Sequence, residues 1–148
     1  MYPSKNASLS LIVGAACLGL TATSSPTPAL SQGAAALNYD FFKNKVEAVF
    51  LEKRPGHTRC VVCHTTNNAP FHLVPRSAGA ETWNEEQSKQ NFQLIQRVAV
   101  AGVAESPLVK HPLAEEAGGD RHHGGGQQFT SQDDPAWQTL KAFVMGAK

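Results

Sequence analysis

The chain has 148 residues, of which 13 are Lys or Arg and 12 are Asp or Glu, so its formal net charge is only +1. A charge this close to neutral, with no basic cluster, gives no argument for binding of nucleic acid. The length allows one small domain after a leader, and a domain of that size buries only a limited core by itself.

Residues 1–31 have the pattern of an export signal. Lys5 makes the start basic, and residues 9–20 form an apolar stretch that is too short to span a bilayer comfortably. Small residues follow, and the Ala-Leu-Ser sequence before Gln32 has the small-x-small pattern of a cleavage site. Two alternatives stay open: Cys17 loosely resembles the lipidated cysteine of a lipoprotein signal, and the apolar stretch can remain as an uncleaved membrane anchor.

The first helix is expected over residues 39–54, after a tether at residues 32–38. Apolar side chains recur there at i, i+4, i+7 and i+8, the spacing of one helix face; they are Phe42, Val46, Val49 and Phe50. Pro55-Gly56 is expected to end this helix.

The remaining elements are also expected to be helices joined by loops. Residues 65–81 lack a period and predict a loop, and the capping box Thr82-x-x-Glu85 predicts a helix that continues to Gly102. Its apolar side is formed by Phe92, Ile95, Val98 and Ala99. Ser106-Pro107 has the pattern of an N-cap followed by proline and predicts a short turn through Leu113.

A glycine-rich loop is expected over residues 114–130. Asp134-Pro135 then predicts a last helix that ends at Gly146. The apolar side of this helix consists of Trp137, Leu140, Phe143 and Val144. The pattern as a whole predicts a small, mainly α domain.

Cys60-Val61-Val62-Cys63-His64 forms the C-x-x-C-H string that attaches a haem covalently. The thiols of Cys60 and Cys63 add to the two vinyl groups of a haem, and the imidazole of His64 then ligates the iron from the proximal side. The motif therefore predicts one covalent haem c. A structural zinc site, a thioredoxin-type redox pair and a plain disulfide are alternatives for the two thiols. The zinc site lacks a second ligand pair, the redox pair lacks surrounding strands, and the disulfide leaves His64 unexplained.

The order of these features resembles the monohaem cytochrome c fold. More narrowly, it resembles a subgroup of bacterial cytochrome c-like domains that carry an HGGG segment and occur widely in exported proteins. The matching segments are Cys60 to His64, Ser106-Pro107-Leu108, His111-Pro112-Leu113, His123-Gly124-Gly125-Gly126 and Asp133-Asp134-Pro135 with Trp137 and Leu140. The resemblance implies a small single-domain cytochrome c-like helical fold around one covalent haem over residues 39–148. It also implies the periplasm or the outer face of a membrane, because covalent haem attachment in bacteria takes place outside the cytoplasm.

The second axial ligand of the iron decides between electron transfer and ligand chemistry. In the arrangement that the chain resembles, this ligand lies in the loop before the last helix. Met145 follows that helix and Met1 lies in the leader, so we do not expect methionine ligation. His123 is the first choice, because it matches the HGGG pattern and precedes glycines, where the backbone can approach a porphyrin without Cβ clashes. His111 is the second choice, with a hydrogen bond to a haem propionate or to the distal ligand as its alternative role. Further candidates are His122 and His72.

Other side chains are candidates for contacts with the cofactor. Arg59 can pair with a haem propionate. Trp137 can pack against the porphyrin or donate its indole N–H to a propionate, with core packing as the alternative. His111, His122 and His123 with Asp120 can instead form a copper or nickel site.

These features predict an exported monohaem c-type cytochrome that carries single electrons and has two histidine ligands. Such ligation predicts a lower reduction potential than in a His/Met cytochrome. The expected partners are redox proteins or a respiratory or photosynthetic complex, and the N-terminus offers a contact with a membrane. The prediction is thus an electron carrier and not an enzyme. The alternative is a haem peroxidase or a small-gas sensor with a displaceable distal ligand, although the sequence displays no separate acid–base constellation for a peroxidase.

Overall fold

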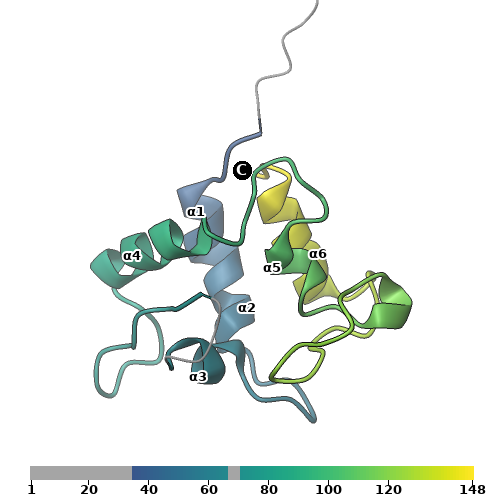
Figure 1. Ribbon diagram of the computed structural model, residues 1–148. Helices are drawn as coiled ribbons and strands as arrows, with labels where there is room; N and C mark the ends of the chain where they lie inside the picture. Colours follow the sequence, from purple (N-terminus) through teal and green to yellow (C-terminus); the bar gives the residue numbers. More distant parts are fainter. Residues whose placement is uncertain (1–34, 67–70) are drawn as a thin grey trace, which may run out of the picture. The chain divides into compact units, whose positions relative to one another are not determined.

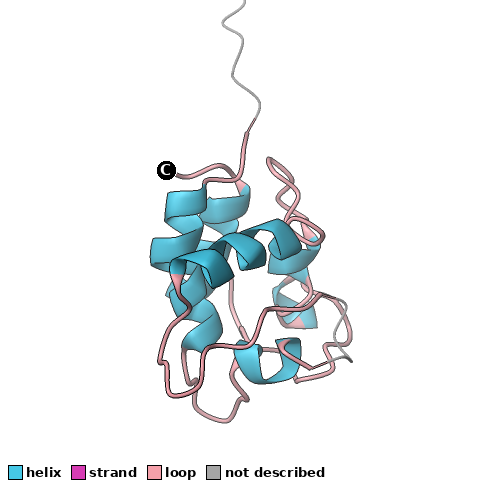
Figure 2. Cartoon of the chain, turned by 90° about the vertical axis from the view of Figure 1, so that its left-hand side faces the viewer, coloured by secondary structure: helices cyan, strands magenta, loops and turns pink. Residues whose placement is uncertain are grey.

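The structure, a computed structural model, describes residues 35–66 and 71–148. The chain divides into Met1–Gln32 and Gly33–Lys148, and the described residues belong to the second unit. The predicted export signal, with Cys17, therefore lies outside the described residues. The described part is mainly helical and forms one small domain without a β-strand, as predicted for the fold class (Figures 1 and 2). None of its helices is long and apolar enough to cross a membrane.

The first helical stretch consists of α1 (Tyr39–Phe41), the π-helical η1 (Phe42–Val46) and α2 (Glu47–Leu51). Asn38 caps its start, because the side-chain oxygen of Asn38 accepts a hydrogen bond of 2.8 Å from the backbone N–H of Phe41. The predicted apolar side is confirmed, since Phe42, Val46, Val49 and Phe50 are all buried. The helix ends at Leu51 and not near Arg54, because the backbone of Glu52 is already extended, with ψ at 133°; Arg54 beyond it forms an ion pair with Asp134.

α3 (Cys60–His64) follows α2 after a short loop and packs against it. α4 (Glu85–Ile95) comes next, and the predicted capping box at Thr82 is wrong by two residues. Asn84 is the N-cap: its side chain accepts a hydrogen bond of 2.9 Å from the backbone of Gln87, whose side chain accepts one of 3.0 Å in return. The buried indole of Trp83 donates to the Val74 carbonyl at 2.7 Å, which keeps residues 82–83 in the preceding loop.

α4 also ends earlier than predicted, at Ile95 and not near Gly102. The Ser106 hydroxyl accepts a hydrogen bond of 2.9 Å from the Val100 backbone and donates one of 2.7 Å to the Val98 carbonyl. These bonds fold the segment after α4 against the start of α5 (Pro107–Lys110). Ser106 therefore occupies the predicted N-cap position of α5, but its hydroxyl bonds to this segment and not to the helix.

The glycine-rich loop is closed at its base by a parallel bridge between Leu113 and Phe129. The backbone N–H of Ala114 donates to the Phe129 carbonyl at 2.8 Å, and a short 3₁₀ helix, η2 (Glu115–Ala117), follows. The bridge joins residues 113 and 129 at the two ends of the loop between them. This loop lies beside α5 (Figure 1).

α6 (Pro135–Val144) closes the domain and begins as predicted. Asp134 is its N-cap, because the carboxylate accepts a hydrogen bond of 2.9 Å from the Ala136 backbone, and proline occupies the first turn. The predicted apolar side is confirmed by the burial of Trp137, Leu140, Phe143 and Val144.

An aromatic cluster joins the three longest helical stretches. Phe42 of η1, Phe92 of α4 and Phe143 of α6 have ring centroids 5.5 to 6.3 Å apart, the range of favourable aromatic pairs. Phe42 and Phe143 are completely buried, so this cluster forms a large part of the core. Its contacts hold η1, α4 and α6 together.

Candidate functional site

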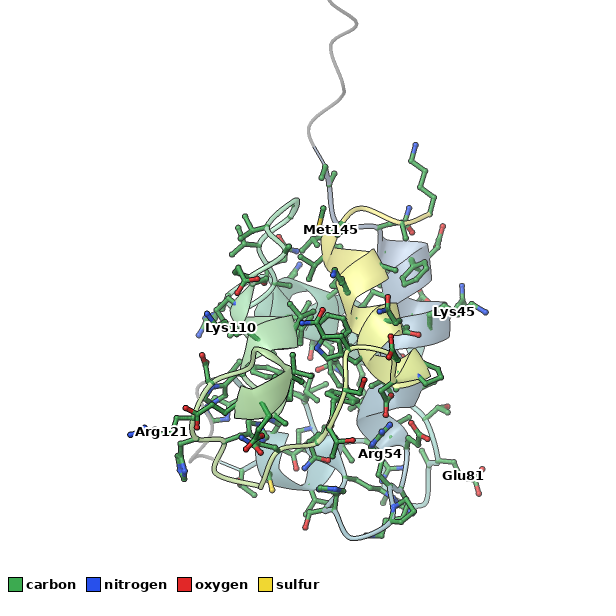
Figure 3. All side chains as sticks on the ribbon, turned by 90° about the vertical axis from the view of Figure 1, so that its right-hand side faces the viewer. Lys45, Arg54, Glu81, Lys110, Arg121 and Met145 are labelled. Atoms are coloured by element: carbon green, nitrogen blue, oxygen red, sulfur yellow. The ribbon has the colours of Figure 1, made fainter. Side chains whose placement is uncertain are left out.

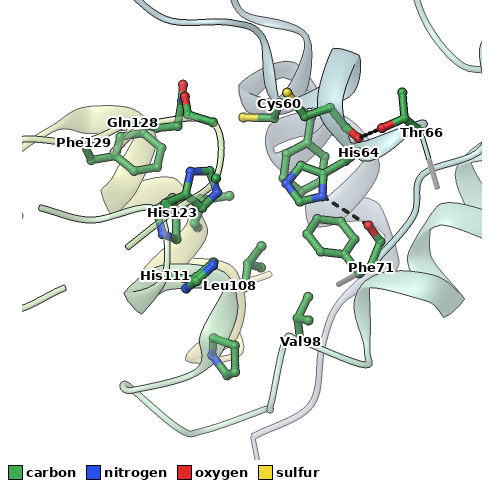
Figure 4. A pocket seen from close by; sticks show the side chains of 17 residues that line it. Cys60, His64, Thr66, Phe71, Val98, Leu108, His111, His123, Gln128 and Phe129 are labelled. Atoms are coloured by element: carbon green, nitrogen blue, oxygen red, sulfur yellow. Dashed lines mark hydrogen bonds between the residues drawn. The ribbon is translucent and has the colours of Figure 1, made fainter. Parts of the chain in front are cut away.

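A cavity of about 560 Å³ lies between α3, α5 and the glycine-rich loop. Its volume falls within the range of about 300–1,000 Å³ that is usual for small-molecule and cofactor sites. Much of its wall is apolar and consists of Phe50, Phe71, Val98, Leu108, Phe129 and Leu140. The same walls carry Cys60, Cys63, His64, His111 and His123 (Figure 4). The structure therefore brings the C-x-x-C-H residues together with the first and second choices for the distal ligand.

The helix α3 places the motif residues on one side. Positions i, i+3 and i+4 of a helix are neighbours on its surface, so Cys60, Cys63 and His64 all reach the same cavity. Both thiols are free. Burial raises the pKa of the Cys60 thiol to about 11, although the nearby Arg54 charge acts in the opposite direction. In the chain without a bound group, the protonated thiol is therefore the favoured form on this wall.

His64 is oriented by the segment that follows the motif. Its Nδ1 lies 3.1 Å from the Phe71 carbonyl, and its ring stacks on the Phe71 ring with centroids 4.1 Å apart. A neutral imidazole that donates through Nδ1 has Nε2 as its basic nitrogen. Burial lowers the pKa of His64, with the charges of the other nearby histidines adding to this effect, while the hydrogen bond to Phe71 opposes it. A neutral, oriented imidazole of this kind is what metal ligation requires.

His123 is oriented in the same way by the glycines that follow it. Its Nδ1 lies 2.7 Å from the Gly126 carbonyl, and Gly126 has a positive φ of 77°, which glycine adopts without strain. Burial lowers the pKa of His123, and the charges of His111 and His122 act in the same direction, against the hydrogen bond to Gly126. A Cβ on Gly125 would stand 3.7 Å from the Cys63 sulfur, so the glycine turn lies directly against the motif.

His64 and His123 face each other across the cavity (Figure 4). Their ring centroids are 6.3 Å apart, and the ring planes are tilted by 33°. A metal ion between two imidazoles needs about this spacing, because two metal–nitrogen bonds of about 2.0 Å and two ring radii of about 1.1 Å together span about 6 Å. The pair therefore fits the iron of a haem held from both sides, and the motif thiols lie beside it.

His111 shares the wall of His123 and not that of His64. The rings of His111 and His123 meet edge to face, with centroids 5.0 Å apart and an interplanar angle of 73°. The Nδ1 of His111 lies 3.1 Å from the carboxylate of Asp120, a residue of the glycine-rich loop. The facing pair is thus His64 with His123, and His111 stands next to the second member.

Other predicted residues lie outside the cavity lining. Trp137 is buried and its indole N–H donates to the Val109 carbonyl at 2.8 Å, so this N–H is already engaged and we assign Trp137 to the core. Arg59 is exposed just before α3, and Met145 is exposed after α6, toward the end of the domain away from Arg54 (Figure 3). His122 is exposed.

The copper or nickel alternative finds no support in residues 35–66 and 71–148. Within these ranges no three His, Cys, Asp or Glu side chains are arranged to hold one metal ion. A site formed by two imidazoles, such as the facing pair of His64 and His123, has fewer than three such side chains, so this absence does not bear on it.

Sequence reasoning missed two side chains that shape the cavity. Arg54 packs over the ring of Phe129 at 4.8 Å and pairs with Asp134, so it ties the end of α2 to the cavity wall and to the start of α6. Gln128 is buried in the wall, and its amide nitrogen lies 3.3 Å from the carbonyls of two glycines of the turn. No local pattern marks either residue, because the partners that link Arg54 to the cavity wall and to α6, Phe129 and Asp134, are distant in sequence, and Gln128 lies in an irregular loop.

Comparisons of the chain with protein-family models, with curated proteins and with solved structures find no match. The residues of the cavity are therefore what supports a function.

Proposed function

We propose that the protein is an exported monohaem c-type cytochrome that carries single electrons. The observation that carries the proposal is the facing pair: two imidazoles, each with Nδ1 bound to a backbone carbonyl, lie 6.3 Å apart beside the Cys60 and Cys63 thiols in one apolar cavity. Cys60 and Cys63 would hold the haem as thioethers, and His64 and His123 would ligate its iron.

The residues suit electron transfer because the chain itself would supply both ligands of the iron. When bound, a haem supplies a one-electron couple between ferric and ferrous iron. Hydrogen bonds to backbone carbonyls would orient the His64 and His123 rings for this ligation. Phe50, Phe71 and Leu140 form an apolar part of the cavity wall. Two imidazoles without a methionine favour a reduction potential below that of a His/Met cytochrome.

The proposed partners are redox proteins or a respiratory or photosynthetic complex. Val62 lies between the two motif cysteines and is 54% exposed, so an apolar side chain adjoins the attachment point on the surface. Because the net charge is only +1, docking there would depend little on ionic strength. Export to the periplasm or the outer face of a membrane belongs to the same proposal, because it rests on residues 1–31 and on covalent haem attachment.

Covalent attachment is tested by expressing the protein in a host competent for haem attachment and separating it under denaturing conditions. We expect the haem to stay with the polypeptide in the natural chain and to be lost from the Cys60→Ala/Cys63→Ala variant. The matched control is Thr66→Ala, which changes a cavity residue outside the motif. A natural chain without haem overturns the proposal.

Axial ligation is tested by absorption spectra of the oxidised and dithionite-reduced protein. We expect low-spin bands in both forms, without the methionine–iron charge-transfer band in the ferric form. The His123→Gly variant should become high-spin, and added imidazole should restore the low-spin spectrum. His122→Gly is the control, because His122 is an exposed neighbour of His123. A low-spin spectrum that persists in His123→Gly contradicts the assignment of His123.

A further inference from the structure

The cavity contains a third oriented imidazole, that of His111. His111 lines the cavity and lies at the C-cap of α5, where its backbone N–H bonds to the Pro107 carbonyl at 3.0 Å. Its ring is edge to face with that of His123 at 5.0 Å. An imidazole in this place stands to one side of the line that joins His64 and His123.

Asp120 determines which nitrogen of His111 is free to act. The carboxylate of Asp120 lies 3.1 Å from Nδ1 of His111, so the neutral ring donates its Nδ1–H to Asp120 and keeps Nε2 as an acceptor. The Asp120 backbone is fixed by its N–H bond to the Lys110 carbonyl at 3.3 Å. The side chains of His111 and Asp120 are 38% and 44% exposed, so this part of the wall is open to small molecules from solvent.

The two neighbouring imidazoles are held very differently. His111 is anchored at a helix end and by a carboxylate from another segment. His123 is anchored through Nδ1 only to Gly126, three residues further along its own turn. A change in the glycine turn can therefore withdraw the His123 ring while His111 stays in place.

We propose that the iron position vacated by His123 binds small protic ligands, such as hydrogen peroxide or hydrogen cyanide, and that Nε2 of His111 accepts the proton that the ligand gives up when its anion binds ferric iron. The proposal rests on the proposed haem site. The structure adds the orientation of this acceptor, because Asp120 meets His111 only through the fold of the glycine-rich loop. Asp120 acts as the positioning residue.

The test uses the intact haem-containing protein with two probes. Hydrogen cyanide, added to the oxidised protein, releases a proton to His111 as cyanide binds, whereas carbon monoxide, added to the reduced protein, has no proton to release. Both are measured by titration of the Soret band in the His123→Gly variant, in which the position is already open. We expect the added substitution His111→Leu to weaken cyanide binding about tenfold, the factor for one lost hydrogen bond, and to leave carbon monoxide affinity unchanged.

Asp120→Ala provides a second variant in the same background and tests the proposal if His111→Leu does not fold. It should weaken cyanide binding about threefold, since His111 remains but loses its orientation. Equal cyanide affinity in all variants, or an equal loss for both probes, overturns the proposal. A His123→Gly spectrum that stays low-spin until His111 is also replaced does so too, because His111 is then itself the ligand. Absence of covalent haem in the natural chain is seen before any probe is added, and it overturns the proposed function as well.

Discussion

Gly119 is the position at which a single methyl group should do the most to disturb the His111 and Asp120 pair. A Cβ on Gly119 would stand 1.9 Å from the Leu113 carbonyl oxygen, and contacts below 3.0 Å are essentially never seen for Cβ atoms. In Gly119→Ala the two backbone segments must therefore separate by at least 1.1 Å, from 1.9 Å to 3.0 Å. Both partners are backbone, so no side-chain rotation can relieve the contact.

The expected cost follows from the bonds that hold the two segments together. Gly119 donates to the Ala114 carbonyl at 2.9 Å, and Asp120 donates to the Lys110 carbonyl at 3.3 Å. A shift of this size breaks or weakens both bonds, at about 1 kcal/mol each, and the overpacking itself costs about 1–3 kcal/mol. We expect Gly119→Ala to lose about 3–5 kcal/mol of unfolding free energy. The movement should also take the Asp120 carboxylate out of hydrogen-bond range of His111.

Guanidinium unfolding of the haem-containing protein measures this loss, with Glu116→Ala as the control. Glu116 lies in the same loop, is exposed, and is not among the residues that line the cavity. Its replacement should leave stability within about 0.5 kcal/mol of the natural protein. Equal unfolding midpoints for the two variants would refute the reasoning, because the backbone approach at Gly119 would then be of no consequence.

Three further predictions concern the core, a buried acid and the motif. Trp137→Phe should cost about 1–3 kcal/mol of unfolding free energy, because the buried Val109 carbonyl loses its donor, while the absorption spectrum stays unchanged; a changed spectrum contradicts the core role of Trp137. Burial raises the pKa of Glu47 above its ordinary value of 4.5, against the opposing effects of Ser88 and Lys43. The folded state therefore holds this proton more tightly than the unfolded chain, so ionisation destabilises the fold as pH rises from 4.5 through the folded pKa. Glu47→Gln should accordingly be more stable relative to the natural protein at about pH 8 than at about pH 4, and equal differences in unfolding midpoint at both values contradict this. Gly125→Val should lower the yield of covalently attached haem on a denaturing gel. Its Cβ would stand 3.7 Å from the Cys63 sulfur, and the added methyl groups would crowd that atom. An unchanged yield contradicts this steric effect.

Features that depend on neighbours within one turn of helix follow from local sequence alone. The spacing of Cys60, Cys63 and His64 puts all three on one side of α3 wherever that helix packs. The start of α6 also depends only on local chemistry, since the Asp134 carboxylate caps the next backbone N–H groups and Pro135 suits the first turn. The apolar faces of the first and last helices were likewise predictable, because an amphipathic helix has one apolar face and that face packs against the core.

Features that depend on partners distant in the chain arise only when the chain folds. α4 begins and ends where it does because Trp83 bonds to Val74 and Ser106 bonds to the segment after the helix. The order of the histidines in the sequence does not say which of them faces His64. That choice depends on the closure of the glycine-rich loop at its base, which places His123 opposite His64 and brings Asp120 to His111. Hydrogen bonds and contacts across many residues have no periodic signature in the sequence, so only the folded chain reveals them.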